Sequence, residues 1–219
     1  MVPSQADGSP KQDRLPAEIT VAIETTRSGG FVLLLVDEGD GMRGDLMVAA
    51  DDSSPTALNV LLTKARGLLC LALDDPLFRR LGLPSDTMAS IGRNPRAPEG
   101  GTTIEAARGV STGISSADRA HTISVAIAPG TTPQDVRRPG HVPVLHAAPG
   151  GVLERHAPTE AAVDLAKLAG LTPAAVLCEV LGPNGEMAGA DELDAVAVSC
   201  GATLLPINTL AAHLREAKS

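Results

Sequence analysis

An acidic turn is the first segment of this sequence whose residue types could do chemistry. It follows the apolar run FVLLLV of residues 31–36, which is typical of a buried strand. The turn contributes Asp37, Glu38 and Asp40, and Asp45 lies a few residues beyond it. Carboxylates at the edge of a strand can hold a divalent metal ion or act as general bases. Because acidic turns are also common without any such role, the pattern alone leaves both interpretations open.

Two further segments offer groups for anion binding and proton transfer. Residues 110–119 read VSTGISSADR, a hydroxyl-rich stretch before a predicted helix, and the free backbone N–H groups of a helix start suit an anion. An ordinary helix cap is the more common role of such a stretch. Residues 137–141 read RRPGH, a predicted rigid turn with two cations and an imidazole that can transfer protons near neutral pH. A single histidine in a loop more often has no catalytic role.

Glu179 is the one charge inside an apolar segment, AAVLCEVL at residues 174–181, which predicts a strand. A buried carboxylate is costly unless it is paired, hydrogen-bonded or protonated, and such sites are enriched in function. The sequence does not say whether Glu179 is buried.

The elements that must position these groups alternate between strand and helix patterns. Strands are expected at 31–36, 68–73, 102–107, 174–181 and 202–206, and helices at 54–66, 75–80, 117–128, 159–169, 190–199 and 208–217. Residues 84–100 are expected to form a loop, and residues 1–15 a disordered tail before one domain at 16–219. The pattern predicts mixed α and β structure, with helices covering a central sheet.

Composition limits the classes of partner. The 219 residues carry a net charge of −8 with a pI near 5.1, which argues against nucleic acid and anionic membranes. Three cysteines without C-x-x-C spacing, no apolar segment long enough to span a bilayer and no signal-peptide pattern favour a cytoplasmic protein. A locally basic pocket for a small anion remains compatible with this composition.

Taken in order, many short stretches resemble the 3,4-dihydroxy-2-butanone 4-phosphate synthase family over about residues 18–214. They are GDL at 44–46, LCL at 69–71, LGLP at 81–84, STGISSADR at 111–119, RPGHV at 138–142, GGVLER at 150–155, TEAAVDL at 159–165, VLCE at 176–179 and NGEMA at 184–188. The resemblance implies an α+β single domain, a mixed sheet flanked by helices, in a homodimer with active sites at the subunit interface. It also implies the conversion of ribulose 5-phosphate to dihydroxybutanone phosphate and formate with the help of magnesium.

The same resemblance implies a set of site residues. The expected catalytic residues are Asp45, Cys70, His141 and Glu179, and the expected substrate-binding residues are Asp40, Thr112, Arg155 and Thr159. Arg155 and Thr159 are expected to contact a phosphate, since a guanidinium fork suits that group. The expected ligand is therefore a small phosphorylated or polyol molecule.

Two departures from the family's pattern concern the metal. The family's acidic loop reads DDEDRENEGD, and in this chain Gly41 stands where that loop has its metal-binding Glu. Pro158 stands where the family's R-x-G-H-T-E run has its metal-binding His. Neither side chain can bind a metal ion, so no metal cofactor is expected, and Mg²⁺ only if a displaced site is rebuilt from neighbours such as Asp40 and His156.

Three hypotheses follow from these departures. The leading one is a divergent paralogue that acts on a sugar phosphate or related polyol by altered, metal-independent chemistry, since many polar pocket residues are retained. The second is a catalytically inactive paralogue that binds a ligand or partners with an active synthase. The third is an active riboflavin-pathway synthase whose metal site has moved.

Overall fold

A computed structural model describes residues 17–39, 41–84 and 102–217. Its helices are α1 (Ala17–Arg27), α2 (Pro55–Val60), α3 (Asp75–Arg80), α4 (Ser116–Ile127), α5 (Pro158–Leu168), α6 (Ala190–Cys200) and α7 (Ile207–Glu216). Its strands are β1 (Val32–Asp37), β2 (Met42–Ala49), β3 (Arg66–Leu73), β4 (Thr103–Ala106), β5 (Val136–His146), β6 (Ala174–Val180) and β7 (Thr203–Pro206). The predicted tail at 1–15 and nearly all of the predicted loop at 84–100 lie outside the described residues.

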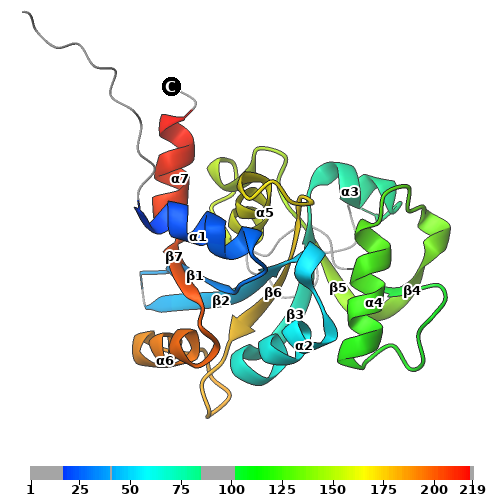
Figure 1. Ribbon diagram of the computed structural model, residues 1–219, viewed down its shortest axis with the longest axis horizontal. Helices are drawn as coiled ribbons and strands as arrows, with labels where there is room; N and C mark the ends of the chain where they lie inside the picture. Colours follow the sequence, from blue (N-terminus) through cyan, green and yellow to red (C-terminus); the bar gives the residue numbers. More distant parts are fainter. Residues whose placement is uncertain (1–16, 40, 85–101, 218–219) are drawn as a thin grey trace, which may run out of the picture.

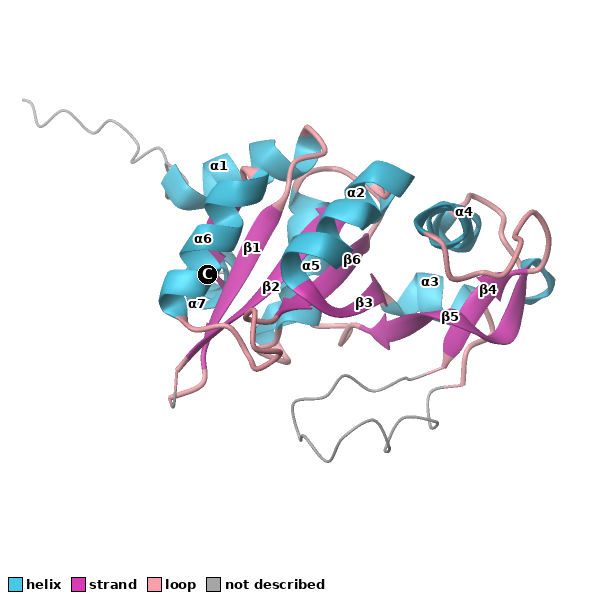
Figure 2. Ribbon diagram, turned by 90° about the horizontal axis from the view of Figure 1, so that it is seen from below, coloured by secondary structure: helices cyan, strands magenta, loops and turns pink. Residues whose placement is uncertain are grey.

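The strands form one mixed sheet in the order β4-β5-β3-β6-β2-β1-β7. The β3–β5 and β1–β7 pairs are parallel, and the β1–β2, β2–β6, β3–β6 and β4–β5 pairs are antiparallel. Figure 1 places β7, β1 and β2 at one end of the molecule and β4, β5 and α4 at the other, and Figure 2 shows the same separation of β1 and β2 from β4, β5 and α4. The expected α+β domain with a mixed sheet flanked by helices is therefore confirmed.

Helices cover both faces of the sheet because side chains alternate along each strand. On β2, Leu46 and Val48 point into a core that α2, α3, α4 and α6 complete. Met47 points into a second core, which is completed by α1, α5 and α7. Aliphatic side chains fill both cores, as the near absence of aromatic residues requires.

The predicted elements that fall within the described residues are found close to their expected positions, but three elements were not predicted. These are α1, β2 and β5. The RRPGH segment was expected to form a turn, and it lies inside β5 instead, at an irregularity of the pairing with β4. Ile104 pairs with Val142 and Glu105 with Arg137, so residues 138–141 bulge out of the ladder, which is where a strand tolerates Pro and Gly.

The boundary between α2 and β3 also differs from the prediction. The helix expected at 54–66 ends in a π-helical turn at Leu61–Ala65, and Arg66 after it takes the left-handed conformation. Gly67 is required because a Cβ there would lie 2.2 Å from the carbonyl oxygen of Glu179. This close approach lets β3 pass beside the charged end of β6.

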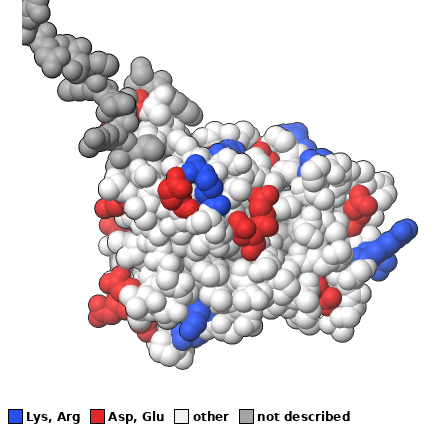
Figure 3. All heavy atoms as spheres, in the orientation of Figure 1, with Lys and Arg blue, Asp and Glu red and all other residues white. Residues whose placement is uncertain are grey.

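On the face drawn in Figure 3, acidic and basic side chains are interspersed. Within the described parts of the chain, no helix combines the length and the apolar character needed to cross a bilayer.

Candidate functional site

Two carboxylates are neighbours on adjacent strands. Asp45 of β2 pairs in register with Glu179 of β6, so both side chains project from the same face of the sheet. Asp45 is partly buried, whereas Glu179 is exposed, which answers the question that the sequence left open. The fold thus brings together two of the expected catalytic residues from distant parts of the chain.

The environment of Asp45 makes its carboxyl group suitable for proton transfer near neutral pH. Burial first, and then the negative charges of Glu179 and Glu38, raise the pKa of Asp45 from 3.8 to about 7. A group whose pKa lies near the working pH can both take and return a proton. Glu38 was read from the sequence only as part of the acidic turn, and the fold adds it to this pair.

Cys70 borders the carboxylate pair, but its thiol is not a nucleophile at neutral pH. It pairs in register with Leu177, two residues before Glu179 on β6, and its side chain is buried. Burial, with the charges of Glu179 and Asp45, raises the pKa of Cys70 to about 12. The thiol therefore stays protonated and can serve as an apolar, weakly donating wall.

A short hairpin turn places a cation next to Gly41. Glu38 and Gly41 close the β1–β2 turn through a hydrogen bond from the Glu38 N–H to the Gly41 oxygen (3.1 Å). A Cβ at Gly41 would lie 3.2 Å from Nη1 of Arg43. Nε of Arg43 lies 3.9 Å from Oε2 of Glu38, and both side chains are about 30% exposed (28% and 31%). Asp40, expected to bind substrate, lies outside the described residues.

The start of α5 holds a buried ion pair. Arg155 donates from Nε to Oε1 of Glu160 at 2.8 Å and from Nη2 to the carbonyl oxygen of His146 at 2.6 Å. Glu160 is fully buried, and its Oε1 also accepts the N–H of Ala148. Arg155 therefore fixes the loop before α5, while its expected contact with a phosphate stays a prediction.

The other expected residues near α5 differ in exposure. Thr159 is buried in the first turn of the helix, and Pro158 occupies the first helical position, where a missing N–H costs nothing. His156, one of the suspected displaced metal ligands, is exposed.

A histidine–carboxylate dyad lies on the paired strands β4 and β5. Nδ1 of His141 is 2.7 Å from Oε1 of Glu105, and the side chains are 42% and 19% exposed. Gly113 packs against both, because a Cβ there would lie 1.4 Å from Glu105 Oε1 and 2.5 Å from His141 Nδ1. Glu105 was missed by the sequence analysis, and no spacing in the sequence connects it with His141.

The hydroxyl-rich loop before α4 is held in place by Asp118. Its carboxylate accepts hydrogen bonds from the N–H and hydroxyl of Ser111 and from the N–H of Gly113, which lower its pKa to about 2. Ser115 caps the helix by accepting the N–H of Asp118, so the expected ordinary cap is present. Thr112 is exposed on the loop that this network fixes, next to the His141–Glu105 dyad.

The dyad and the carboxylate pair stand well apart within one chain. His141 is on β5 and Asp45 on β2, and β3 and β6 lie between them. At roughly 4.8 Å per strand, the backbone of β5 is about 14 Å from that of β2, and about 10 Å from that of β6, which carries Glu179. A single copy of the chain therefore holds these acid–base groups in two places.

The chain matches the sequence profile of 3,4-dihydroxy-2-butanone 4-phosphate synthase over residues 20–213. It belongs to that family. The synthase of Mannheimia succiniciproducens is 42% identical over 195 residues, covering 89% of this chain and 90% of the relative. The synthase of Oleidesulfovibrio alaskensis is 46% identical over 170 residues, covering 78% and 77%.

A solved synthase structure has the same fold. It is described as a 3,4-dihydroxy-2-butanone 4-phosphate synthase in complex with two magnesium ions, and it matches with a TM-score of 0.82 at 31% identity. The match covers 91% of this chain and 97% of that one. Magnesium is thus bound by a member of the family, while the metal use of this chain is a separate question.

The donor groups of this chain do not fit a magnesium site at the position that the family implies. Gly41 and Pro158 have no ligating side chain, and the guanidinium of Arg43 lies against Gly41. No group of three His, Cys, Asp or Glu residues that could hold a metal ion occurs in the ranges 17–39, 41–84 and 102–217. The predicted displaced site at Asp40 and His156 is not tested, because Asp40 is outside those ranges.

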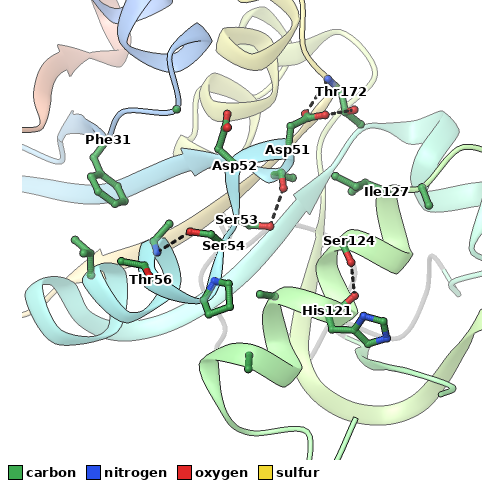
Figure 4. A pocket seen from close by; sticks show the side chains of 18 of the residues that line it. Phe31, Asp51, Asp52, Ser53, Ser54, Thr56, His121, Ser124, Ile127 and Thr172 are labelled. Atoms are coloured by element: carbon green, nitrogen blue, oxygen red, sulfur yellow. Dashed lines mark hydrogen bonds between the residues drawn. The ribbon is translucent and has the colours of Figure 1, made fainter. Parts of the chain in front are cut away.

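A large open pocket lies elsewhere, between the start of α2 and α4 (Figure 4). Its volume is about 1120 Å³, and it is lined by residues such as Asp51, Asp52, Thr56, His121 and Ser124. Asp51 is fixed by Thr172 through two hydrogen bonds. None of the residues expected from the synthase resemblance lines this pocket, so we place the candidate site at the carboxylate pair.

Proposed function

We propose that this chain catalyses the reaction for which its relatives are named, converting ribulose 5-phosphate to 3,4-dihydroxy-2-butanone 4-phosphate and formate. The observation that carries the proposal is the Asp45–Glu179 pair, in which one carboxyl group has its pKa near neutrality. A ketose rearrangement begins with removal of the proton on the carbon next to the carbonyl, and such a step needs a base of this kind. Relatives that are 40–46% identical and named as synthases favour this reaction over an altered one.

Asp45 and Glu179 have separate tasks in this proposal. Asp45, whose pKa lies near neutrality, takes a proton from carbon and can return it, and Glu179, exposed beside it, contacts the oxygens of the substrate. Cys70 lines the same place with a neutral thiol. Arg155 and Thr159 would face the phosphate end of the substrate.

We also propose a homodimer that brings the His141–Glu105 dyad of one copy to the carboxylate pair of the other. The roughly 10 to 14 Å between the strands that carry these groups in one chain is too far for direct proton transfer. Ile114 lies next to Gly113 in the loop before α4 and is 55% exposed, which suits a residue that is covered by a second copy. Thr112 on the same loop would then reach the substrate in the partner's site.

A second candidate is metal-independent chemistry on a related sugar phosphate or polyol. The loss of ligating side chains at Gly41 and Pro158 favours it. An inactive paralogue has no specific support from the geometry, since the carboxylate pair and the dyad are both in place.

The direct test incubates the purified protein with ribulose 5-phosphate and measures formate by coupled formate dehydrogenase. Parallel reactions contain EDTA or 5 mM MgCl₂, and Asp45→Asn is the inactive comparison. Formate release by the wild type and at least a hundredfold less by Asp45→Asn supports the proposal. No formate under either condition refutes it, and consumption of ribulose 5-phosphate without formate supports the second candidate.

A further inference from the structure

We propose that the guanidinium of Arg43 supplies the positive charge that binds the reacting oxygens of the substrate, at the place where the family uses a metal ion. This inference rests on the proposed function, because it assigns a role within the same site.

The side chain of Arg43 lies next to Gly41, where the family's pattern has a metal-binding Glu. Its Nη1 atom lies 3.2 Å from where a Cβ of Gly41 would be, so the cation occupies the space into which a side chain at position 41 would begin to grow. Arg43 and Asp45 are two residues apart on β2 and therefore project from the same face of the sheet. The guanidinium thus lies at the turn end of the sheet face that carries the carboxylate pair.

Carboxyl groups make the candidate site acidic. Glu38 lies 3.9 Å from Arg43, and Asp45 carries a pKa that burial first, and then the charges of Glu179 and Glu38, raise to about 7. A phosphorylated substrate, and still more an enediolate formed from it, would add negative charge to an acidic site. A cation on the same face of the sheet offsets this added charge, and the Arg43 side chain is about 30% exposed (28%), so a ligand can reach it.

The shape of the guanidinium group suits a pair of neighbouring oxygens. A guanidinium presents its N–H donors in a planar fork, which can contact two oxygens on neighbouring carbons at once. A ketose offers such a pair in its carbonyl and the adjacent hydroxyl. A metal ion would hold these oxygens by chelation, whereas Arg43 would hold them by two charge-assisted hydrogen bonds.

The step that Arg43 assists is the first proton transfer. A carboxylate of the pair takes the proton from the carbon that bears the hydroxyl, and the electrons of that C–H bond form a C=C bond. The carbonyl electrons move onto its oxygen, which gives an enediolate whose negative charge faces the guanidinium. Because the cation is fixed before the reaction, it stabilises this charge without reorganisation.

The experiment compares the wild type with Arg43→Gln and Arg43→Lys in the formate assay, after removal of metals with EDTA. Arg43→Gln keeps hydrogen-bond donors but removes the charge, and Arg43→Lys keeps the charge but removes the fork. We expect kcat/KM to fall by about 100- to 1000-fold in Arg43→Gln, the loss typical of one oxyanion contact, and by less in Arg43→Lys. Arg79→Met, an exposed arginine on α3, is the matched control and should behave as the wild type. Circular dichroism checks that each variant is folded.

Two results would overturn the proposal. One is a wild type that loses activity in EDTA and regains it with Mg²⁺, and the other is a loss of less than tenfold in Arg43→Gln. If the wild type makes no formate at all, the proposed function fails, and calorimetry with ribulose 5-phosphate tests Arg43 separately. At least tenfold weaker binding by Arg43→Gln would keep the assigned role of Arg43, and equal affinity would remove it.

Discussion

Replacing Asp45 by Asn should stabilise the protein at alkaline pH while it abolishes turnover. The raised pKa of Asp45 means that the folded protein prefers the protonated carboxyl group, whereas the unfolded chain ionises at its ordinary pKa of 3.8. The folded state therefore binds more protons than the unfolded state between pH 4 and 7. Stability is lost as the pH rises through this window, and it levels off above pH 7. Asn cannot ionise and escapes the loss.

The size of the effect follows from the two pKa values. With 3.8 for the unfolded chain and about 7 for the folded protein, ionisation costs about 1.7 kcal/mol at pH 5 and about 4 kcal/mol at pH 8. The difference in unfolding free energy between Asp45→Asn and the wild type should therefore widen by about 2.5 kcal/mol over this range. Any loss of hydrogen bonds in the variant shifts both ends alike and cancels.

Urea denaturation followed by far-ultraviolet circular dichroism measures this difference, because the chain has neither Trp nor Tyr for fluorescence. Asp37→Asn is the matched control, an exposed carboxylate on the adjacent strand β1. A gap between Asp45→Asn and the wild type that stays constant from pH 5 to pH 8 would refute the reasoning. It would mean that Asp45 has no raised pKa in the folded protein.

Three other predictions concern the dyad, the buried ion pair and the assembly. Gly113→Ala should lower the unfolding free energy by more than the strain of a left-handed residue, which is about 1–2 kcal/mol, because the new Cβ collides with Glu105. Gly130→Ala measures the strain alone, because Gly130 has a φ of +79° and no atom would lie within 4 Å of its Cβ. Equal losses of unfolding free energy in the two variants would contradict the collision. Arg155→Ala should cost about 3–5 kcal/mol in urea denaturation by leaving Glu160 buried and unpaired, and a loss below 1 kcal/mol would contradict that role. Light scattering should give twice the mass of the 22.3 kDa chain, and a stable monomer at micromolar concentration would refute the homodimer.

The sequence alone determined the elements whose own pattern is strong. The apolar runs of β1, β3 and β6 and the helices α4 and α5 are found where their periodicity placed them, because burial of an apolar run or stripe hardly depends on which partner covers it. The order of short motifs also identified the family, since each motif is written in neighbouring residues.

Tertiary structure decided the strands and contacts that depend on distant parts of the chain. β2 and β5 carry Gly, Pro and charged residues that weaken any local strand signal, and pairing with β6, β3 and β4 fixes them. The raised pKa of Asp45 is a consequence of the same register, because only this pairing sets Glu179 beside it. Likewise, the bond between Glu105 and His141 joins residues 36 apart, and the place of Arg43 against Gly41 depends on how one turn closes. Residue types indicate which chemistry is available. Electrostatic interactions and hydrogen bonds, however, act over a few ångströms, and only the packed chain sets the distances between the groups.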